Sequence, residues 1–244
     1  MNLQTGLYRV KMARRGTPAD SSSRPAAPRD RLLETAGALF YRHGFQAVGI
    51  DRILAESGVA KMTLYRHFAS KDELIAAYLE RADHEFWAWA EAAMASAVAP
   101  EAQLLALFDA LASHATGPEC LGCPFQGAAL AFPELDHPAH RWALRNKIAL
   151  RDRLAELARH AGLRAPGSLA AQLLLLMDGA WVAARVFGRE GSPADEVGAA
   201  ARALVEAHRR EPATSSSPGS RPPRATTGTP APARRASSRG PRAP

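Results

Sequence analysis

The segment from Ile50 to Lys71 constrains the fold of this chain more than any other. Its first apolar residues are spaced three and four apart, which places them on one face of a short helix. Gly58 follows, and glycine ends helices readily because it adopts a left-handed conformation without a Cβ clash. A second short helix is expected from about Lys61 to Phe68, with Leu64 and Phe68 on its buried side. Two short helices joined by a glycine-containing turn form a helix-turn-helix.

The second helix directs a distinctive set of side chains away from its apolar side: Lys61, Met62, Thr63, Tyr65, Arg66 and His67. The set contains cations, hydroxyl groups and a ring that can stack, but no carboxylate. Such groups suit the phosphates and base edges of a DNA major groove. A helix hairpin with an ordinary solvated face is the alternative interpretation of the same spacing.

Residues 58–71 read Gly-Val-Ala-Lys-Met-Thr-Leu-Tyr-Arg-His-Phe-Ala-Ser-Lys. This segment resembles the DNA-reading segment of tetracycline-repressor-type (TetR/AcrR) regulators, chiefly through Leu-Tyr-x-His-Phe followed by Ser-Lys. The resemblance extends back to about Arg31. It implies the following contacts: phosphates held by Thr63, Tyr65, His67 and Lys71, and base edges met by Lys61 and Met62.

Charge is spread unevenly along the 244 residues, whose formal net charge is +7. Residues 30–71 carry +2 and residues 72–211 carry −6, while both ends of the chain are rich in arginine. Affinity for nucleic acid is therefore expected in the ends and in the helix-turn-helix. Two cysteines, no signal peptide and no apolar run judged long enough to span a membrane favour the cytoplasm, with no membrane partner.

The periodicity predicts an all-α chain of about nine helices. We expect a disordered basic arm (1–28), a helix-turn-helix DNA-binding domain (29–71), a helical ligand-binding and dimerisation domain (72–210) and a disordered tail rich in proline, serine and arginine (211–244). Met12 offers a second plausible start of translation. Ser70 and Glu73 form a capping box that begins a long helix, Ser168 is expected to cap an apolar helix ending near Gly188, and Ser192 the last helix.

The resemblance also implies a small-molecule site between the central helices of the second domain. Such sites are largely apolar with a few polar groups. The candidate lining residues are Trp89, Phe108, Phe125, Trp142, Met177 and Trp181, with Arg145 and Asp178 as candidate polar anchors. For each of them, plain core packing is the alternative.

The pairs Cys120-x2-Cys123 and His137-x2-His140 raise the question of a zinc site. The cysteine spacing fits zinc, but the histidines are closer together than the usual three to five intervening residues. We therefore expect neither metal nor cofactor, and a redox-sensing thiol pair stays open beside ordinary buried cysteines. The sequence contains no nucleophile elbow and no glycine-rich phosphate loop, so no enzyme is expected.

These features together predict a homodimeric, ligand-responsive transcriptional regulator, a repressor that binds a palindromic operator and is released by a small apolar molecule. By resemblance, helices near 168–188 and 193–209 pair with their mates. The apolar run Leu173–Leu176 supports this pairing, because Leu174 and Leu176 lie on different sides of one helix and burying both requires a partner. The alternatives are a thiol or metal stress sensor acting through Cys120 and Cys123, and a non-specific nucleoid-associated DNA binder.

Overall fold

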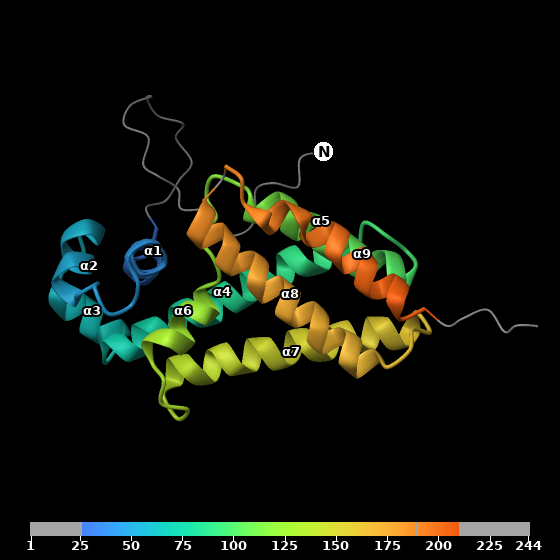
Figure 1. Cartoon of the computed structure of the whole chain (residues 1–244). Coiled ribbons are helices and arrows are strands. Elements are labelled where there is room, and N and C mark those ends of the chain that lie inside the picture. Colours follow the sequence, from blue (N-terminus) through green and yellow to red (C-terminus); the bar gives the residue numbers. More distant parts are fainter. Residues whose placement is uncertain (1–25, 189, 210–244) are drawn as a thin grey trace, which may run out of the picture. The chain divides into compact units, whose positions relative to one another are not determined.

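The computed structural model describes residues 26–188 and 190–209 (Figure 1). Within these residues it contains nine α-helices, one 3-10 helix and no strand, so the all-α prediction is confirmed. The helices are α1 (Pro28–His43), α2 (Ile50–Ser57), α3 (Lys61–His67), α4 (Lys71–Met94), α5 (Pro100–Ala115), α6 (Pro124–Ala131), α7 (Pro138–His160), α8 (Pro166–Phe187), the 3-10 helix η1 (Pro193–Glu196) and α9 (Val197–Ala207). The expected tail, Met12 and nearly all of the expected basic arm lie outside the described residues.

Helices α1, α2 and α3 form a headpiece in which α2 and α3 both pack against α1. Gly58 ends α2 with φ 64° and ψ 24°, the left-handed conformation expected from the sequence. Leu64 is fully buried and Phe68 is 2% exposed, so the buried side of α3 is also as predicted. The guanidinium of Arg29 lies 5.4 Å from the centre of the Phe68 ring, which attaches the end of α3 to the start of α1.

The long helix α4 begins at a capping box, in a variant form. The backbone N–H of Glu73 donates to Ser70 Oγ at 3.1 Å, and the backbone N–H of Ala69 donates to Glu73 Oε2 at 2.7 Å. The glutamate thus satisfies the amide one residue before the N-cap rather than that of the cap itself. These bonds fix the point at which α4 leaves the headpiece.

The described residues contain two apolar cores that meet along α4. The first core joins the headpiece to the beginning of α4, to α6 and to the beginning of α7. The rings of Phe45 and Phe132 show this connection, with centroids 5.9 Å apart. The second core joins the remainder of α4 and α7 to α5, α8 and α9 (Figure 1). Helix α6 is therefore packed with the headpiece although it is distant from it in sequence.

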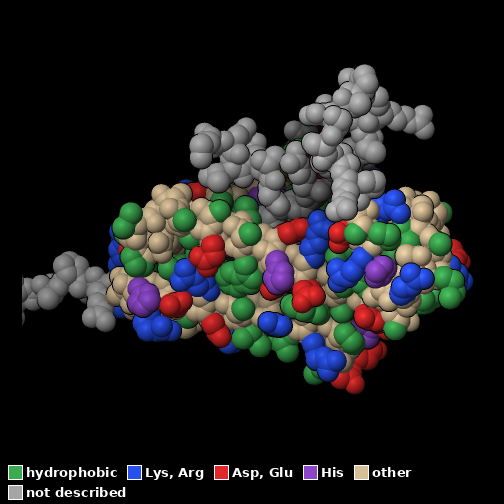
Figure 2. Space-filling view, turned by 180° about the vertical axis from the view of Figure 1, so that it is seen from behind, with side chains coloured by type: hydrophobic (Ala, Val, Ile, Leu, Met, Phe, Trp, Pro, Cys, Tyr) green, Lys and Arg blue, Asp and Glu red, His purple; other side chains and the backbone are tan. Residues whose placement is uncertain are grey.

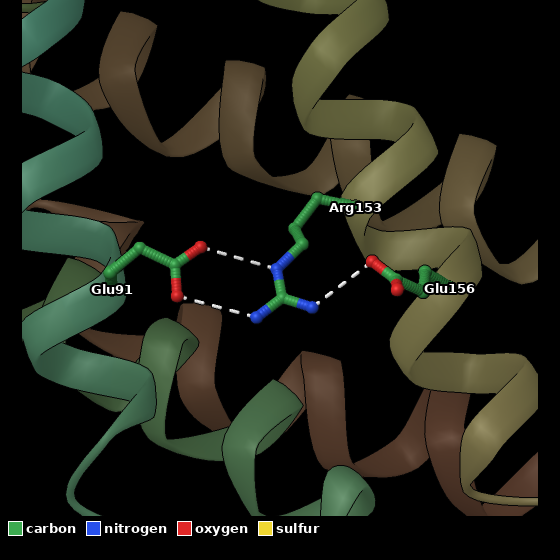
Figure 3. A network of polar contacts seen from close by, with 3 residues as sticks. All are labelled: Glu91, Arg153 and Glu156. Atoms are coloured by element: carbon green, nitrogen blue, oxygen red, sulfur yellow. Dashed lines mark hydrogen bonds and ion pairs between the residues drawn. The ribbon is translucent and has the colours of Figure 1, made fainter.

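Polar contacts on the surface add to the packing of α4 on α7. Arg153 donates from Nε and Nη2 to the two carboxylate oxygens of Glu91, at 3.2 and 3.3 Å, and from Nη1 to Glu156 at 3.1 Å (Figure 3). A guanidinium that binds a carboxylate through two parallel bonds holds a defined orientation. Elsewhere, acidic and basic side chains are interspersed over the face of the described residues that Figure 2 shows.

Two helix starts near the end of the described chain differ from the predicted ones. Helix α8 begins at Pro166, after Ala165 with φ 45°, so the prediction that Ser168 caps it is wrong. Proline dominates here because its fixed φ suits the first helical position and its missing N–H is not needed there. Ser192 does act as a cap, since its Oγ accepts from the backbone N–H of Ala194 at 3.3 Å, but the segment starts as η1 before α9.

The prediction that no apolar run is long enough to cross a membrane is wrong for helix α8. By length and composition alone it is long and apolar enough to do so, among the described residues. In this structure, however, it packs against α5, α7 and α9. Core helices of helical proteins often meet the same compositional criterion, because they too are apolar on most sides.

Candidate DNA interface and effector cavity

The predicted DNA-contacting residues lie together on α3 and at the first residue of α4. Lys61 and Arg66 are exposed, and Met62 and Tyr65 are 77% and 45% exposed. The remaining three, Thr63, His67 and Lys71, are half-buried. Leu64 anchors the opposite side of α3, so the polar side faces outward. No carboxylate occurs in α3, which gives this surface the character that a polyanion requires.

The neighbouring helix α2 does contain carboxylates, but one of them is paired within the helix. Arg52 Nε donates to Glu56 Oε1 at 2.9 Å, four residues away. Arg52 Nη2 also lies 3.0 Å from His43 Nε2, at the end of α1. This local pairing reduces the negative field that Glu56 contributes near α3.

A small cavity lies between α4, α6, α7, α8 and the loop that precedes α6. Its volume is about 10 Å³, which is room for a single water-sized molecule. The lining residues are Phe86, Gly122, Cys123, Pro124, Phe125, Asn146, Lys147, Leu150 and Trp181. The lining is thus mainly aromatic and apolar, with a few polar groups, as is typical of ligand sites.

The amide and ammonium groups of the cavity lining come from α7. The ammonium of Lys147 pairs with the carboxylate of Asp178 on α8 and lies 3.8 Å from Cys123 Sγ. The side chains of Lys147 and Asp178 are 19% and 27% exposed. Beside them, Asn146 is 1% exposed and donates from Nδ2 to Asp83 Oδ1 at 2.8 Å. Lys147 is therefore the cationic group that the lining offers to a bound molecule.

The structure brings some of the predicted pocket residues together and separates others. Phe125 and Trp181 line the cavity, and Asp178 holds Lys147. Phe108 and Met177 are fully buried in the second core. Trp89 packs beside the cavity, with its ring centroid 6.5 Å from that of Trp181, while Trp142 and Arg145 pair with each other at 4.9 Å and do not line the cavity.

Sequence reasoning named two of the residues that line the cavity, Phe125 and Trp181. It missed the other seven: Phe86, Gly122, Cys123, Pro124, Asn146, Lys147 and Leu150. One signal could have found Lys147. It lies three and seven residues before Leu150 and Leu154, and therefore on the apolar stripe of α7. A lysine on such a stripe needs an acidic partner, because an unpaired buried charge is costly.

His114 on α5 lies behind the cavity wall. Its ring meets the ring of Trp181 edge-on, with centroids 5.4 Å apart. Burial lowers the pKa of His114 to about 4, so the imidazole is neutral at physiological pH. Its Nε2 is buried and has no hydrogen-bond partner among the described residues.

The loop before α6 is hydrogen-bonded to Tyr41 on α1. Tyr41 Oη donates to the carbonyl of Gly122 at 2.9 Å and accepts from the backbone N–H of Leu121 at 2.8 Å. Burial, with Cys120 and Cys123 close by, raises the pKa of Tyr41, so its hydroxyl keeps its proton. The neighbouring Cys120 is buried, and burial likewise raises its pKa.

The cysteine and histidine pairs do not assemble into a metal site. Within residues 26–188 and 190–209, no group of three or more histidine, cysteine, aspartate or glutamate side chains could hold a metal ion. His137 stacks on Phe132 with centroids 4.1 Å apart, and the ring of His140 bonds to the carbonyl of Phe132 at 2.8 Å. Both histidines are thus engaged in packing the turn before α7.

Comparison with known proteins agrees with this geometry. The family model described as bacterial regulatory proteins, tetR family, matches residues 32–78, which include α2 and α3. The crystal structure of SCO4454, a TetR-family transcriptional regulator from Streptomyces coelicolor, is 35% identical and superposes with a TM-score of 0.70, covering 74% of this chain and 95% of that one. The chain belongs to the TetR family. This TetR-family protein is therefore a helix-turn-helix transcriptional regulator and not an enzyme.

Two curated relatives are similar to parts of this TetR-family regulator. The HTH-type transcriptional repressor SCO4008 of Streptomyces coelicolor is 34% identical over 119 residues, which are 48% of this chain and 58% of the relative. The HTH-type transcriptional activator FasR of Mycolicibacterium smegmatis is 45% identical over 53 residues, 22% of this chain and 24% of FasR. The chain thus spans little more than half of the one relative and about a quarter of the other.

Proposed function

We propose that this regulator is a cytoplasmic homodimer that represses transcription by binding a palindromic operator, and that a small, largely apolar molecule releases it. The observation that carries the proposal is the outward face of α3, which has cations and no carboxylate and is fixed from behind by Leu64. SCO4008, described as a repressor, is similar over 119 residues, whereas the activator FasR is similar over 53, and the longer similarity supports repression.

In the proposed complex, α3 of each protomer enters a major groove. Lys61 and Met62 meet base edges, while Thr63, Tyr65, His67 and Lys71 hold phosphates and Arg66 adds positive charge. A single helix of seven residues makes few contacts, so specific binding requires two copies held a whole number of helical turns of DNA apart. That requirement is the physical reason for a dimer and for a palindromic site.

The outward face of α8 supports dimerisation through α8 and α9. Leu175, Val182 and Val186 are 72%, 51% and 70% exposed and recur at helical spacing on one side of α8. By contrast, Leu174 and Leu176 are only partly exposed and pack against the chain's own core. Leu175 is therefore a better position to test the interface than the two leucines singled out from the sequence.

The effector is proposed to occupy the cavity beside Lys147. The aromatic lining suits an apolar body, and the ammonium of Lys147 suits a hydrogen-bond acceptor on that body. Because the cavity has room for one water only, a larger molecule requires the surrounding wall to move. Release of DNA then follows if the effector binds the opened state more tightly than the DNA-bound one.

Thiol or metal sensing by Cys120 and Cys123 is a weaker candidate. The raised pKa of buried Cys120 disfavours the reactive thiolate, and the described residues contain no cluster of metal ligands. A non-specific nucleoid-associated binder would act through the basic ends of the chain, which lie outside the described residues. Selection of DNA duplexes from a random library distinguishes such a non-specific binder from a sequence-specific regulator.

The full chain should be used to select duplexes from a random library spanning about three helical turns. We expect a pseudo-palindromic motif to be enriched, with half-sites about one turn or two turns apart, and two protomers per duplex by light scattering. Selection without any enriched motif would contradict the proposal and favour the non-specific binder.

A further inference from the structure

Hydrogen bonds link both ends of helix α6 to the headpiece. Just before its first residue, the Tyr41 hydroxyl on α1 accepts a hydrogen bond from the backbone N–H of Leu121 at 2.8 Å and donates one to the carbonyl of Gly122 at 2.9 Å. At its last residue, the carbonyl of Ala131 accepts from Gln46 Nε2 at 3.0 Å. The headpiece therefore holds α6 through polar contacts as well as through the shared apolar core.

The same segment forms one wall of the cavity. Gly122, Cys123, Pro124 and Phe125 all line it. Gly122 and Cys123 lie outside any helix, whereas the lining residues from α4, α7 and α8 belong to long helices. Irregular backbone between helices opens at lower free energy than packed helices do. An occupant larger than one water is therefore expected to displace this wall first.

On its other side the wall is held against α8. A Cβ atom at Gly122, where φ is +96°, would lie 3.2 Å from the carbonyl oxygen of Trp181 and 3.4 Å from Arg185 Cβ. Arg185 Nη1 also donates to the carbonyl of Leu121 at 3.4 Å. The segment thus has α8 on one side and the Tyr41 hydroxyl of α1 on the other, so its displacement acts on α1.

We propose that Tyr41 is a positioning residue that transmits occupation of the cavity to the DNA-binding headpiece. When an occupant displaces residues 122–125, the two hydrogen bonds of the Tyr41 hydroxyl shift the end of α1, against which α2 and α3 pack. The inference rests on the proposed function, because it describes how the cavity and the DNA-reading helix communicate.

The test compares Tyr41→Phe with Tyr78→Phe. Tyr41→Phe keeps the ring and removes both hydrogen bonds to the wall. Tyr78 on α4 lies in the core that joins the headpiece to α6, and its buried hydroxyl has no hydrogen-bond partner among the described residues. Tyr78→Phe therefore removes a tyrosine hydroxyl without removing a hydrogen bond. Faster hydrogen exchange of the Leu121 amide in Tyr41→Phe, but not in Tyr78→Phe, would show that the intended bonds were lost.

A covalent probe can occupy the cavity without knowledge of the natural effector. Benzyl methanethiosulfonate converts the Cys123 thiolate to a benzyl disulfide and releases methanesulfinate, and dithiothreitol reverses the reaction. Cys120→Ala in every protein restricts the reaction to Cys123, with Cys123→Ser as the unreactive control, and mass spectrometry verifies one adduct. The readout is the ratio of Kd values for the selected duplex after and before modification.

We expect modification to weaken DNA binding by about tenfold or more in the parent protein and in Tyr78→Phe, within the usual range of allosteric coupling. In Tyr41→Phe we expect a change of about threefold or less. Equal losses in the parent and in Tyr41→Phe, or no loss in the parent, would overturn the role of Tyr41. Failure of the unmodified parent to bind any selected duplex would instead contradict the proposed function.

Discussion

Removing one member of the Lys147–Asp178 pair should destabilise the protein more than removing both. Lys147→Met leaves the Asp178 carboxylate on α8 without its ammonium, and Asp178→Leu leaves the ammonium beside an apolar cavity. The double variant leaves neither charge, and its two side chains are apolar. The comparison therefore separates the cost of an orphaned charge from the worth of the pair.

The exposed fractions of the two side chains determine how much free energy of unfolding is lost when the pair is broken. An exposed pair contributes about 0–1 kcal/mol, and breaking a buried pair from one side costs about 3–5 kcal/mol. The side chains of Lys147 and Asp178 are 19% and 27% exposed, which places the pair between these limits. We expect each single variant to lower the free energy of unfolding by about 2 kcal/mol, and the double variant by about 1 kcal/mol or less.

Thermal unfolding measures the loss of stability in each variant. All variants are compared at one fixed protomer concentration, because the Tm of a dimer depends on concentration. About 2 kcal/mol corresponds to a fall in Tm of roughly 4–8 °C for a chain of this size. Asp109→Asn is the matched control, since it breaks the pair with Arg202, whose members are about half exposed. Single variants that fall no further than this control would refute the reasoning.

Three further predictions concern a cap, a buried histidine and the proposed interface. Ser70→Ala should lower the free energy of unfolding by about 1 kcal/mol through loss of the α4 cap, whereas Ser168→Ala, which removes no cap, should change it by less than about half of that, as measured in urea. The pKa of His114 falls to about 4 on folding, so as the pH decreases the unfolded chain binds this proton before the folded chain does. The free energy of unfolding should therefore be constant in this respect above about pH 6.5 and should fall towards pH 4, by up to about 3 kcal/mol. His114→Phe should flatten that part of the profile of stability against pH. Leu175→Glu should yield a monomer by light scattering, whereas Leu135→Glu, at a position equally exposed in the turn before α7, should not; a dimeric, folded Leu175→Glu would place the interface elsewhere.

The headpiece could be predicted from the sequence because its determinants are local. Gly58 ends α2 in a conformation that glycine favours, and Ser70 and Glu73 begin α4 within a single turn. The spacing of Leu64 and Phe68 already identifies the buried side of α3. Two local signals compete at the start of α8, and Pro166 rather than Ser168 determines where this helix begins.

The cavity could not be predicted in the same way, because its residues come from four helices and a loop whose mutual positions depend on tertiary packing. Aromatic residues such as Phe108 and Trp142 were plausible on composition, yet neither lines the cavity. The four-residue apolar run Leu173–Leu176 covers every side of a helix, since successive residues are about 100° apart. Such a run cannot indicate that Leu175 is the exposed member.

The most direct test of the central claim, that α3 reads DNA sequence, is to measure Lys61→Ala on the selected duplex and on an unrelated duplex over a range of salt concentrations. We predict that Lys61→Ala relaxes preference at one position of each half-site and leaves non-specific binding nearly unchanged. Lys71→Ala should weaken binding to both duplexes and lower the salt slope by about one unit. Equal loss of specific and non-specific affinity in Lys61→Ala would contradict the account.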